Sequence, residues 1–255
     1  MITAVVASFY QLRFTFYLLL SNFYLMQISV IIPTFNEELT IEKTLDAISR
    51  LVNVDEVIIV DGGSADKTVE IVENYGLKKP FKMINLGEAN RGKQLHEGTQ
   101  HASHEIFWFL HADTRPSQGC AREIKKYMNY DEIVGGNFQV LFDGGSRWAR
   151  FMMWLHPQLQ STGLIYGDSA IFARRTTYEK IGGYKPLPIL EDVDFVKRLR
   201  KKGDFRFMNK AVTTSSRRFQ NRAFFWAFTK WSIFQSLYWL GVPAKTLAKR
   251  YKAIK

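Results

Sequence analysis

The chain has 255 residues, of which 46% are hydrophobic and 15% aromatic, and a formal net charge of +11. This length and composition suit one large α/β domain, or one domain with appendages. The single cysteine, Cys120, excludes an internal disulfide, and the lack of CxxC and HExxH spacings argues against a zinc site of the usual kind. A basic chain suits polyanionic partners such as nucleic acid, anionic lipid or phosphorylated substrates.

The first 27 residues are apolar, and Arg13 is their only charge. A membrane span of roughly 20 residues would fit within this segment. No small-residue cleavage site precedes the first strand-like run, which argues against a secretory signal peptide. A third interpretation is that translation starts at Met26, so that the preceding residues are a start-site extension. We therefore treat 1–27 as a separate segment.

Four short apolar runs predict the parallel strands of an α/β domain. They cover 28–33, 57–60, 82–86 and 106–110. Three helical patterns lie between them, and we expect these helices to begin after Asn36 as an N-cap, near Val69 and at about Lys93. Repeated strand, loop and helix predict right-handed crossovers and a parallel sheet.

The second half of the chain is less regular. We expect strands at 135–142 and 167–173, a helix at 178–183 that ends in glycine, and a helix from Glu191 to about 202. Cys120 falls in another predicted helix and has no expected role. Apolar and aromatic residues dominate 148–155 and 223–243.

Polar clusters follow three of the predicted strands. Glu37 follows the first strand, Asp61 ends the second, and Asp113 lies just beyond the fourth. Ligands of parallel sheets bind beyond the carboxyl ends of the strands, so we expect these clusters to converge on one crevice. The first loop reads PTFNEE where dinucleotide-binding folds have GxGxxG, and no P-loop is present. Acidic strand ends instead indicate recognition of a base and ribose, with a hard cation bridging Asp113 and a diphosphate.

Four motifs, in this order, carry a resemblance to a known family. They are Pro33-Thr34-Phe35-Asn36-Glu37, Val60-Asp61-Gly62-Gly63-Ser64 with Asp66-Lys67-Thr68, Ala112-Asp113, and Glu191-Asp192. Their order and spacing resemble those of family 2 glycosyltransferases, and the likeness covers about 28–219. It implies the α/β GT-A fold of nucleotide-diphospho-sugar transferases, with a Rossmann-like, mainly parallel sheet and flanking helices. It also favours translation from Met26, so we expect residues 1–25 to be dispensable for folding and activity.

The resemblance implies roles for these positions. Glu37 and Asp61 match acidic residues that bind the base and ribose of the donor. Asp113 matches the aspartate that holds a divalent cation, Mg²⁺ or Mn²⁺, and Asp192 matches the catalytic base, with Glu191 beside it. Ser216-Arg217-Arg218-Phe219 is similar to a late basic and aromatic motif near the diphosphate or acceptor. Further nucleotide- and substrate-binding positions implied by the resemblance are Pro33, Asn36, Gly63, Arg91, Lys93, His111, Ala112 and Arg218.

Two departures from the family pattern affect the expected metal site. His111 stands where the family's DxD motif has its first aspartate, and a neutral imidazole adds no negative charge. No histidine follows His156, so the late histidine ligand of some GT-A enzymes is missing. Asp113 is then the only expected protein ligand, and the metal affinity should be weaker than usual. His156 itself is expected to have no catalytic role.

The resemblance implies an inverting transfer of sugar from a nucleotide diphosphate, expected to be a UDP-sugar, to an acceptor hydroxyl. A positioned carboxylate that accepts the hydroxyl proton contributes about 10²–10⁴ in rate. Two other functions stay open: a degenerate protein that only binds a nucleotide sugar, and a sugar nucleotidyltransferase, whose glycine-rich, arginine-containing first loop is absent. The α/β half contains no aromatic and basic motif of the kind that binds nucleic acid, so we expect no nucleic-acid partner.

The tail at 220–255 combines aromatic and basic residues. Polar residues between Thr229 and Ser236 gather on one side of a helical wheel, so we predict an amphipathic helix that lies in a membrane surface. A helix packed on the catalytic domain and a true span are the alternatives. We expect peripheral attachment to the cytoplasmic side of a membrane, or a cytoplasmic protein, and a lipid-linked or lipophilic acceptor. The tail residues on which this rests are Phe224, Phe225, Trp226, Phe228, Trp231, Phe234, Tyr238 and Trp239, followed by Lys245, Lys249, Arg250, Lys252 and Lys255.

Overall fold

A mixed eight-stranded sheet organises the part of the chain that the computed structural model describes, which is 26–161, 165–217 and 223–250, without the side chains at 161, 223–228 and 231. The strands are β1 (Ile28–Thr34), β2 (Glu56–Asp61), β3 (Phe81–Asn85), β4 (Ile106–Phe109), β5 (Thr114–Pro116), β6 (Ile133–Phe142), β7 (Phe172–Arg174) and β8 (Asp204–Thr214). The helices are α2 (Ile41–Ser49), α3 (Thr68–Asn74), α4 (Arg91–Gln100), α5 (Cys120–Met128), α6 (Arg147–Ser161), α7 (Arg175–Lys180), α8 (Glu191–Leu199), α9 (Ala223–Trp239) and α10 (Ala244–Arg250). A 3₁₀ turn, η1 (Gly167–Ser169), lies between α6 and β7.

The amino-terminal half of the sheet is parallel, as predicted. Its strands lie in the order β3-β2-β1-β4, and each neighbouring pair is parallel. In the register of this half, Thr34 lies opposite Asp61, and Val30 lies opposite Trp108. The polar residues that follow β1, β2 and β4 therefore lie at the same edge of the sheet, which we call the carboxyl edge.

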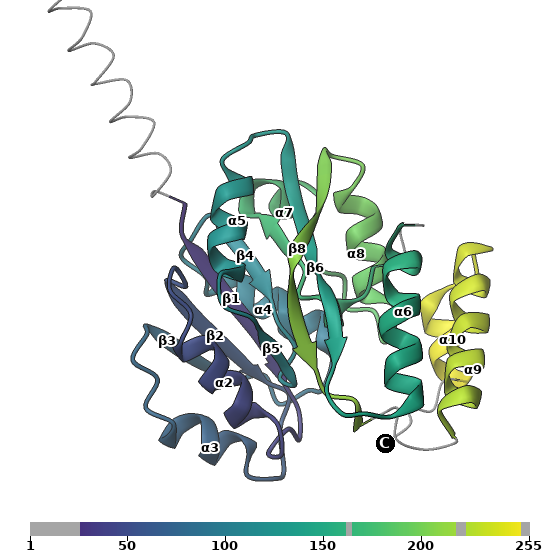
Figure 1. Cartoon of the computed structure of the whole chain (residues 1–255), viewed down its shortest axis with the longest axis horizontal. Helices are drawn as coiled ribbons and strands as arrows, with labels where there is room; N and C mark the ends of the chain where they lie inside the picture. The colour runs from purple at the N-terminus through teal and green to yellow at the C-terminus, as the bar shows by residue number, and fades with distance from the viewer. Residues whose placement is uncertain (1–25, 162–164, 218–222, 251–255) are drawn as a thin grey trace, which may run out of the picture.

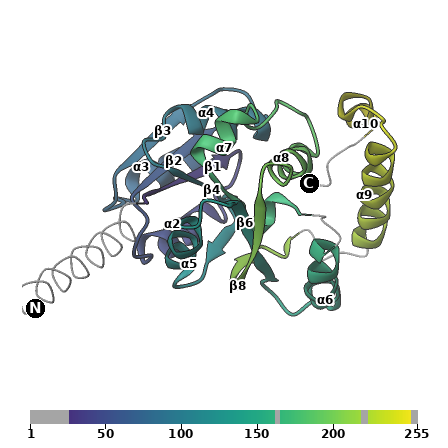
Figure 2. The same cartoon turned by 90° about the horizontal axis from the view of Figure 1, so that it is seen from above.

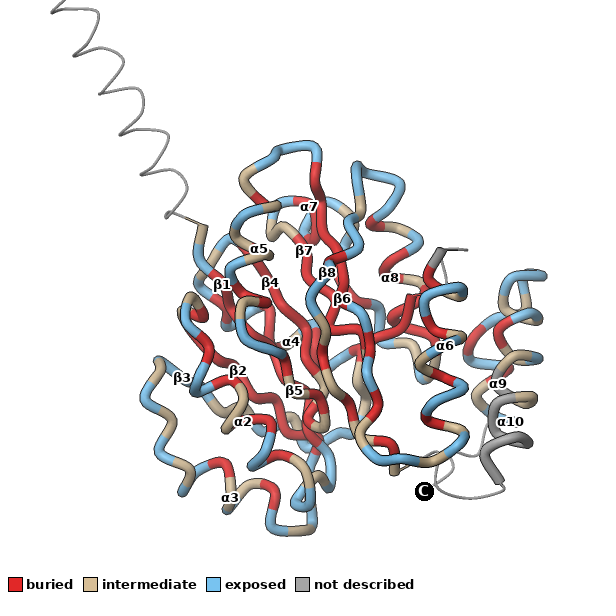
Figure 3. Tube along the Cα trace, in the orientation of Figure 1, coloured by how far each residue is buried: buried red, intermediate tan, exposed pale blue. Residues whose placement is uncertain are grey.

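Helices cover both faces of the sheet (Figures 1 and 2). Successive residues of a strand point to opposite faces, and β1 uses both. Val30 and Ile32 pack with Leu45 of α2 on one face, whereas Ile31 packs with Phe195 of α8 on the other. Figure 3 shows β1, β2 and β4 buried along their length, whereas β3 and β8 are largely exposed. Each fully buried aliphatic side chain contributes about 1.5–3 kcal/mol, so both helix layers are held to the sheet.

The carboxyl-terminal half of the sheet is mixed, and the sequence predicted less of it. β7 runs antiparallel to β4 and β6, β8 runs parallel to β6, and β5 runs antiparallel to β8. β8 was not predicted because most of its residues are polar or exposed, and few of them, such as Met208 and Val212, are buried. Its strand structure depends on backbone pairing with β6, which is distant in the chain.

Two local predictions are wrong. Asn36 does not cap the first helix, which begins at Ile41 after Thr40; it adopts a left-handed φ of 55°, which asparagine tolerates. The expected strand at 167–173 is instead η1 followed by the shorter β7, because Ala170 has a left-handed φ of 53° that interrupts an extended backbone.

The tail forms the predicted helix as α9, and α9 and α10 lie together at one side of the molecule (Figure 2). A small apolar cluster joins α10 to the start of α8: Leu247 packs with Tyr166, Leu190 and Val193. Leu190 stands immediately before α8 with a left-handed φ of 61°, and it is 7% exposed. The entry into α8 is therefore tied to the tail.

Among the side chains of α9 that the structure describes, the apolar ones do not all face the domain. Phe234 and Tyr238 pack against the domain, whereas Ile233 and Trp239 on the same helix are each 53% exposed. The described part of α9 thus packs on the domain, and attachment to a membrane stays a prediction. Within the described ranges, no helix has the length and apolar character needed to cross a bilayer. The predictions for residues 1–25 lie outside those ranges.

Candidate active site

Asp61, the last residue of β2, is fully buried and organises the loops at the carboxyl edge. Its Oδ2 accepts the backbone N–H groups of Gly63 and Ser64 at 2.8 and 2.7 Å. Its Oδ1 accepts the hydroxyls of Thr34 and Ser64 at 3.0 and 2.6 Å. A carboxylate has about four acceptor sites, so the chain itself occupies all of them. Asp61 shapes the loop that would meet a nucleotide, and its direct contact with base and ribose stays a prediction.

Two amide side chains hold the same loops together. Gln94 of α4 donates to the carbonyl oxygens of Thr34 and Val60, both at 2.8 Å, and so ties the ends of β1 and β2. The Oδ1 of Asn36 accepts the backbone N–H of Ala65 at 2.9 Å. The left-handed conformation of Asn36 therefore serves to bridge the loops after β1 and β2.

Arg217, just after β8, connects two of the predicted carboxylates. Its Nη2 donates to both oxygens of Glu37, at 2.7 and 2.6 Å, and lies 3.6 Å from Oδ2 of Asp113. Asp113 also accepts a hydrogen bond from the hydroxyl of Thr214 at 3.3 Å. We call Glu37, Asp113 and Arg217 the Arg217 cluster. It brings Glu37 and Asp113 together as the sequence predicted, through an arginine next to the predicted Arg218.

A second arginine, Arg91, lies at the start of α4 and pairs with the start of α8. Its Nε donates to Oε1 of Glu191, and its Nη2 lies 3.9 Å from Oδ2 of Asp192. Burial lowers the pKa of Arg91, but the charges of Glu191 and Asp192 outweigh this effect and raise it. We call these three residues the Arg91 cluster. Its two carboxylates lie in the first turn of α8, where the helix dipole stabilises negative charge.

The carboxylate of Asp192 is 6% exposed and is held from two sides. Its Oδ2 accepts the N–H of Gly167 at 2.7 Å, and its Oδ1 accepts the N–H of Val193 at 2.8 Å. Burial and then the charge of Glu191 raise the pKa of Asp192 to about 6, against the lowering effects of Arg91 and the two backbone hydrogen bonds. A carboxylate with a pKa raised toward neutrality has the acidity that a general base requires.

Gly167 of η1 lies close to both Asp192 and His111. A Cβ at this position would be 2.6 Å from Nε2 of His111 and 3.4 Å from Oδ2 of Asp192, so a larger residue would displace one of them. His111 lies two residues before Asp113 in the chain. The segment 111–113 therefore connects the Arg217 cluster to the Arg91 cluster, and the two form one candidate site.

The other predicted positions lie around this site. Pro33 lies opposite Val60 in the sheet, and Gly63 has a left-handed φ of 86° in the loop that Asp61 holds. Ala112 is buried, and its carbonyl accepts the hydroxyl of Thr44 at 2.8 Å. Lys93 pairs with the exposed Glu88 at 2.6 Å and joins neither cluster. Arg218 lies outside the described residues.

Asp113 suits a cation that is shared with a ligand. Across the described ranges, no three histidine, cysteine, aspartate or glutamate side chains gather where they could hold a metal ion. Mg²⁺ takes about six oxygen ligands and retains several waters. Most of the ligands would therefore have to come from a diphosphate and water. The residues fit a shared ion, anchored by Asp113, and do not fit a metal centre enclosed by protein.

Gly167, Asp168 and His156 contribute to the surroundings of Asp192 although the sequence did not predict it. Gly167 supplies a hydrogen bond to Asp192, and Asp168 lies 3.6 Å from Nε2 of His156. No local pattern joins these residues, because they lie on η1 and α6. The only signal in the sequence is an acidic residue next to glycine at 167–168, in a segment where the sequence predicts a strand.

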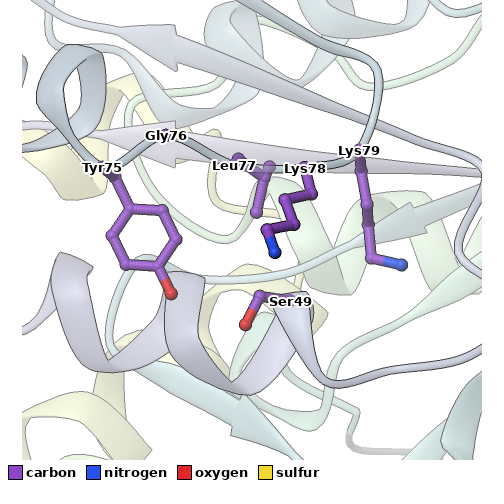
Figure 4. A pocket seen from close by; sticks show the side chains of 6 residues that line it. All are labelled: Ser49, Tyr75, Gly76, Leu77, Lys78 and Lys79. Atoms are coloured by element: carbon purple, nitrogen blue, oxygen red, sulfur yellow. The ribbon is translucent and has the colours of Figure 1, made fainter.

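Two surface pockets lie elsewhere. The larger, of about 340 Å³, lies at the ends of α2 and α3 (Figure 4), and the other, of about 270 Å³, is lined by residues of the same two helices and Tyr75. The larger pocket is lined by Ser49, Tyr75, Gly76, Leu77, Lys78 and Lys79. Neither pocket contains a predicted site residue, so neither is the candidate active site.

Comparisons with known proteins identify the family to which the chain belongs. The family model described as glycosyl transferase family 2 matches residues 29–185. The chain is 27% identical over 212 residues to the "Probable glycosyltransferase YdaM" of Bacillus subtilis, covering 74% of this chain and 50% of that protein. It is 28% identical over 190 residues to a dolichyl N-acetyl-alpha-D-glucosaminyl phosphate 3-beta-D-2,3-diacetamido-2,3-dideoxy-beta-D-glucuronosyltransferase of Methanococcus voltae, covering 66% of this chain and 57% of that protein. The chain thus spans little more than half the length of these relatives.

Two solved structures share the fold. One is the mannosyltransferase PcManGT of Pyrobaculum calidifontis with GDP-Man and Mn²⁺, with a TM-score of 0.64, 18% identity, and 90% of this chain and 66% of that chain covered. The other is TarS 1–349 of S. aureus with UDP-GlcNAc, with a TM-score of 0.62, 20% identity, and 75% of this chain and 59% of that chain covered. Because the family model matches more than half of its residues, the chain belongs to glycosyl transferase family 2.

Proposed function

We propose that this enzyme transfers a sugar from a nucleotide diphosphate to an acceptor hydroxyl, with Asp192 as the general base. The observation that carries this proposal is the environment of Asp192. Its carboxylate is buried, oriented by the N–H of Gly167 at 2.7 Å, and has a pKa raised to about 6. It belongs to the same carboxyl edge as Glu37 and Asp113, where ligands of parallel sheets bind.

The proposed reaction is a single displacement. A carboxylate oxygen of Asp192 takes the proton of the acceptor hydroxyl. At the same time the hydroxyl oxygen of the acceptor attacks the anomeric carbon, and the bond between this carbon and the diphosphate breaks. The backbone N–H groups of Gly167 and Val193 fix the orientation of the base. Attack by the acceptor without a covalent intermediate inverts the anomeric configuration, in contrast to mechanisms that use a second carboxylate as nucleophile.

Two arginines are placed to stabilise the departing diphosphate. Arg217 and Arg91 both contact carboxylates of the site, and their guanidinium groups can pair with phosphate oxygens in a planar, bidentate manner. Positive charge near the leaving group lowers the free energy of a transition state in which negative charge develops. We further propose that Asp113 anchors Mg²⁺ or Mn²⁺, which when bound would neutralise diphosphate charge.

The donor that we propose first is a UDP-sugar. The TarS structure of the same fold was solved with UDP-GlcNAc, whereas PcManGT was solved with GDP-Man and Mn²⁺. The fold alone therefore does not select the base. Glu37 and the loop held by Asp61 are the proposed base and ribose contacts. A screen of UDP- and GDP-sugars, measured by release of the nucleoside diphosphate, decides between these donors.

We also propose a lipid-linked or lipophilic acceptor and a peripheral position on the cytoplasmic side of a membrane. The relative from Methanococcus voltae is named for a dolichyl phosphate substrate. Exposed apolar residues lie on α6 and at the end of α9, where Trp154 and Leu240 are 63% and 82% exposed. Lys245 and Lys249 of α10 are also exposed and would favour an anionic surface.

This proposal divides the chain into the segment 1–27, a catalytic domain at 28–219 and a membrane-associating tail at 220–255. Sedimentation of the protein with anionic liposomes tests it. We expect binding that weakens in high salt, because the Debye length falls to about 3 Å at 1 M. Truncation after Arg222 should abolish binding. A full-length protein that never sediments with anionic liposomes would contradict the membrane part and leave the transferase part intact.

The central experiment replaces Asp192 by asparagine, which keeps the shape and removes the basicity. We expect the rate of transfer to fall by about 10² or more, the loss expected from removing a general base, while donor affinity stays nearly unchanged. Asp194→Asn is the matched control on the same helix. Asp194 pairs with Arg198 at 2.7 Å and Lys185 at 3.5 Å, away from the Arg91 cluster, so its loss should affect stability more than rate.

Each alternative function has its own outcome in these assays. A degenerate protein would bind nucleotide sugars without releasing a nucleoside diphosphate under any condition. A nucleotidyltransferase would form a nucleotide sugar from a nucleoside triphosphate and a sugar phosphate, with release of pyrophosphate. An Asp192→Asn enzyme that retains more than about a tenth of the transfer rate would show that Asp192 is not the base.

A further inference from the structure

The buried His156 and the partly exposed Asp168 form a close pair next to the candidate site. His156 lies on α6 and is 2% exposed, and Asp168 is the middle residue of η1. Nε2 of His156 lies 3.6 Å from Oδ1 of Asp168, within the range of an ion pair. Burial raises the pKa of Asp168, but the nearby imidazole of His156 outweighs burial and lowers the pKa, with His111 and Arg91 adding to the effect.

The two side chains have few other partners. Among the residues that the structure describes, neither ring nitrogen of His156 has a hydrogen-bond partner, nor does Oδ1 of Asp168. Buried polar groups without partners cost free energy, so such groups are retained where a nearby charge compensates them. For His156 that charge is Asp168. The pair therefore holds the side of η1 that faces α6.

The other end of η1 contacts the proposed base. Gly167 begins the turn and donates its N–H to Oδ2 of Asp192 at 2.7 Å. The turn is short and closed: the hydroxyl of Ser169 donates to the carbonyl of Tyr166 at 2.5 Å, and Ala170 follows with a left-handed φ of 53°. A shift of Asp168 must therefore move Gly167, its neighbour in the chain.

We propose that His156 and Asp168 are positioning residues, which hold η1 so that the Gly167 N–H orients the carboxylate of Asp192. This inference rests on the proposed role of Asp192 as base. His156 acts through Asp168, and Asp168 acts through the backbone of Gly167. Neither side chain takes part in proton transfer. Their contribution belongs to the step that Asp192 performs and not to the binding of the donor.

A second histidine–carboxylate pair provides a matched comparison. Nε2 of His104 lies 3.9 Å from Oε1 of Glu56, and the two side chains are 18% and 7% exposed. This pair lies at the opposite edge of the sheet, at the start of β2. Glu56 also accepts hydrogen bonds from Ser29 and Ser103, each at 2.5 Å. Loss of its histidine should therefore affect folding without reaching Asp192.

The experiment measures kcat, donor KM and the unfolding temperature for His156→Gln, Asp168→Asn, their double variant and the control His104→Gln, all in the full chain. We expect kcat to fall about 10-fold or more in both single variants, since misplacement of a reacting group by about 1 Å can cost 10²-fold. Donor KM should stay within about threefold, and the double variant should lose little more than either single variant, because both act on one contact. Asp168→Glu, which keeps the charge, should retain more activity than Asp168→Asn.

Three results would overturn the inference: kcat unchanged in folded single variants, an equal loss of kcat in His104→Gln, or losses that multiply in the double variant. If the single variants do not fold, Gly167→Ala disturbs the same turn, because its Cβ would lie 2.6 Å from Nε2 of His111, so that either this ring or the backbone at 167 must move. Normal kcat in that variant would also contradict the proposal. A near-normal rate of the Asp192→Asn enzyme would instead show that Asp192 is not the base. That result would contradict the proposed function, and it is measured independently of the His156 and Asp168 variants.

Discussion

β2 carries a buried carboxylate at each of its ends. Glu56, at its start, is 5% exposed and accepts hydrogen bonds from Ser29 and Ser103. Asp61, at its end, is 0% exposed and accepts four hydrogen bonds from the adjacent loops. The two groups share chemistry, burial and hydrogen-bond satisfaction, yet only Asp61 lies at the carboxyl edge. Position along the strand, and not burial, separates a carboxylate of the site from one that stabilises the fold.

The two edges also differ in the acidity of their carboxyl groups. Burial would raise the pKa of Glu56, but hydrogen bonds from Ser103 and Ser29 outweigh it and lower the pKa. At the carboxyl edge, burial and the charge of Glu191 raise the pKa of Asp192. The start of β2 therefore keeps a fixed charge at neutral pH, whereas the carboxyl edge holds a group able to take up a proton.

The largest expected contrast is between Asp61→Asn and Glu56→Gln. An amide at position 61 turns an acceptor into a donor that faces the N–H groups of Gly63 and Ser64, and each unsatisfied buried donor costs about 1–3 kcal/mol. We expect kcat/KM to fall about 10²-fold for Asp61→Asn, since two such penalties disorganise the loop. Glu56→Gln should lower the unfolding free energy by about 1–3 kcal/mol and change kcat/KM by less than about twofold. Steady-state kinetics measure kcat/KM and denaturant unfolding measures the free energy of unfolding for both variants. Equal losses of kcat/KM would show that the two ends of β2 do not differ in function.

A second contrast compares Asp113→Ala with Asp55→Ala. We expect the former to weaken nucleotide binding about 10-fold and to abolish the response to Mg²⁺ or Mn²⁺, because interactions with a charged group are worth about 1.5–3 kcal/mol. Asp55 pairs with Lys125 at 2.9 Å and accepts the N–H of Ile28 at 2.8 Å, so its removal should leave binding unchanged. Calorimetric titration of the nucleoside diphosphate, with and without metal, measures both. A metal response that survives in Asp113→Ala would assign the ion to another group.

The third prediction concerns pH. A base must be deprotonated, so kcat/KM should be half-maximal near pH 6 and fall about 10-fold for each unit below it. Because the folded pKa of Asp192 is raised above its unfolded value, its contribution to stability is present at low pH and is lost as pH rises through about 6. Glu56, with a lowered pKa, contributes stability that is lost as pH falls.

Glu191→Gln sharpens the pH prediction. It removes the neighbouring charge that raises the pKa of Asp192 and leaves Arg91 close to Asp192, so the acid limb of the rate profile should move to lower pH. Glu56→Gln should leave that limb in place. An unshifted limb in Glu191→Gln would mean that another group controls the rate.

The smallest expected effect is at the pocket in Figure 4. Lys78 is an exposed residue of its lining, remote from both arginine clusters. Lys78→Ala should change the unfolding free energy by less than about 0.5 kcal/mol and leave nucleotide affinity unchanged. Fluorescence titration and thermal unfolding suffice as measurements. A clear loss of nucleotide affinity would move the binding site away from the carboxyl edge.

The parallel half of the fold was predictable because its signals are local. The sequence runs of β1, β2 and β4 are continuous and apolar. Because ligands bind beyond the carboxyl ends of parallel strands, the acidic residues at these ends could be predicted to lie in one site. The family model confirms the resemblance on which the fold and the transferase activity were predicted.

The rest of the site depends on contacts between distant elements. Arg217 reaches Glu37 only because β8 pairs with β6 and returns the chain to the carboxyl edge, and β8 has no strong apolar pattern. His156 and Asp168 meet across two elements. Asn36 was assigned to a helix cap by residue type alone, although its left-handed backbone and its bond to Ala65 serve the neighbouring loop.

Leu190 couples the tail to the chemistry. It holds a left-handed φ of 61° immediately before Glu191 and packs with Leu247 of α10. For a residue other than glycine this conformation costs about 1–2 kcal/mol, which the packing of its side chain offsets. The packing that holds α10 on the domain thus also helps to fix the start of α8, and with it the orientation of Asp192. We therefore expect that a partner that draws α10 away from the domain would change the orientation of Asp192, and that occupancy of the candidate site would in turn change the affinity of the tail for that partner.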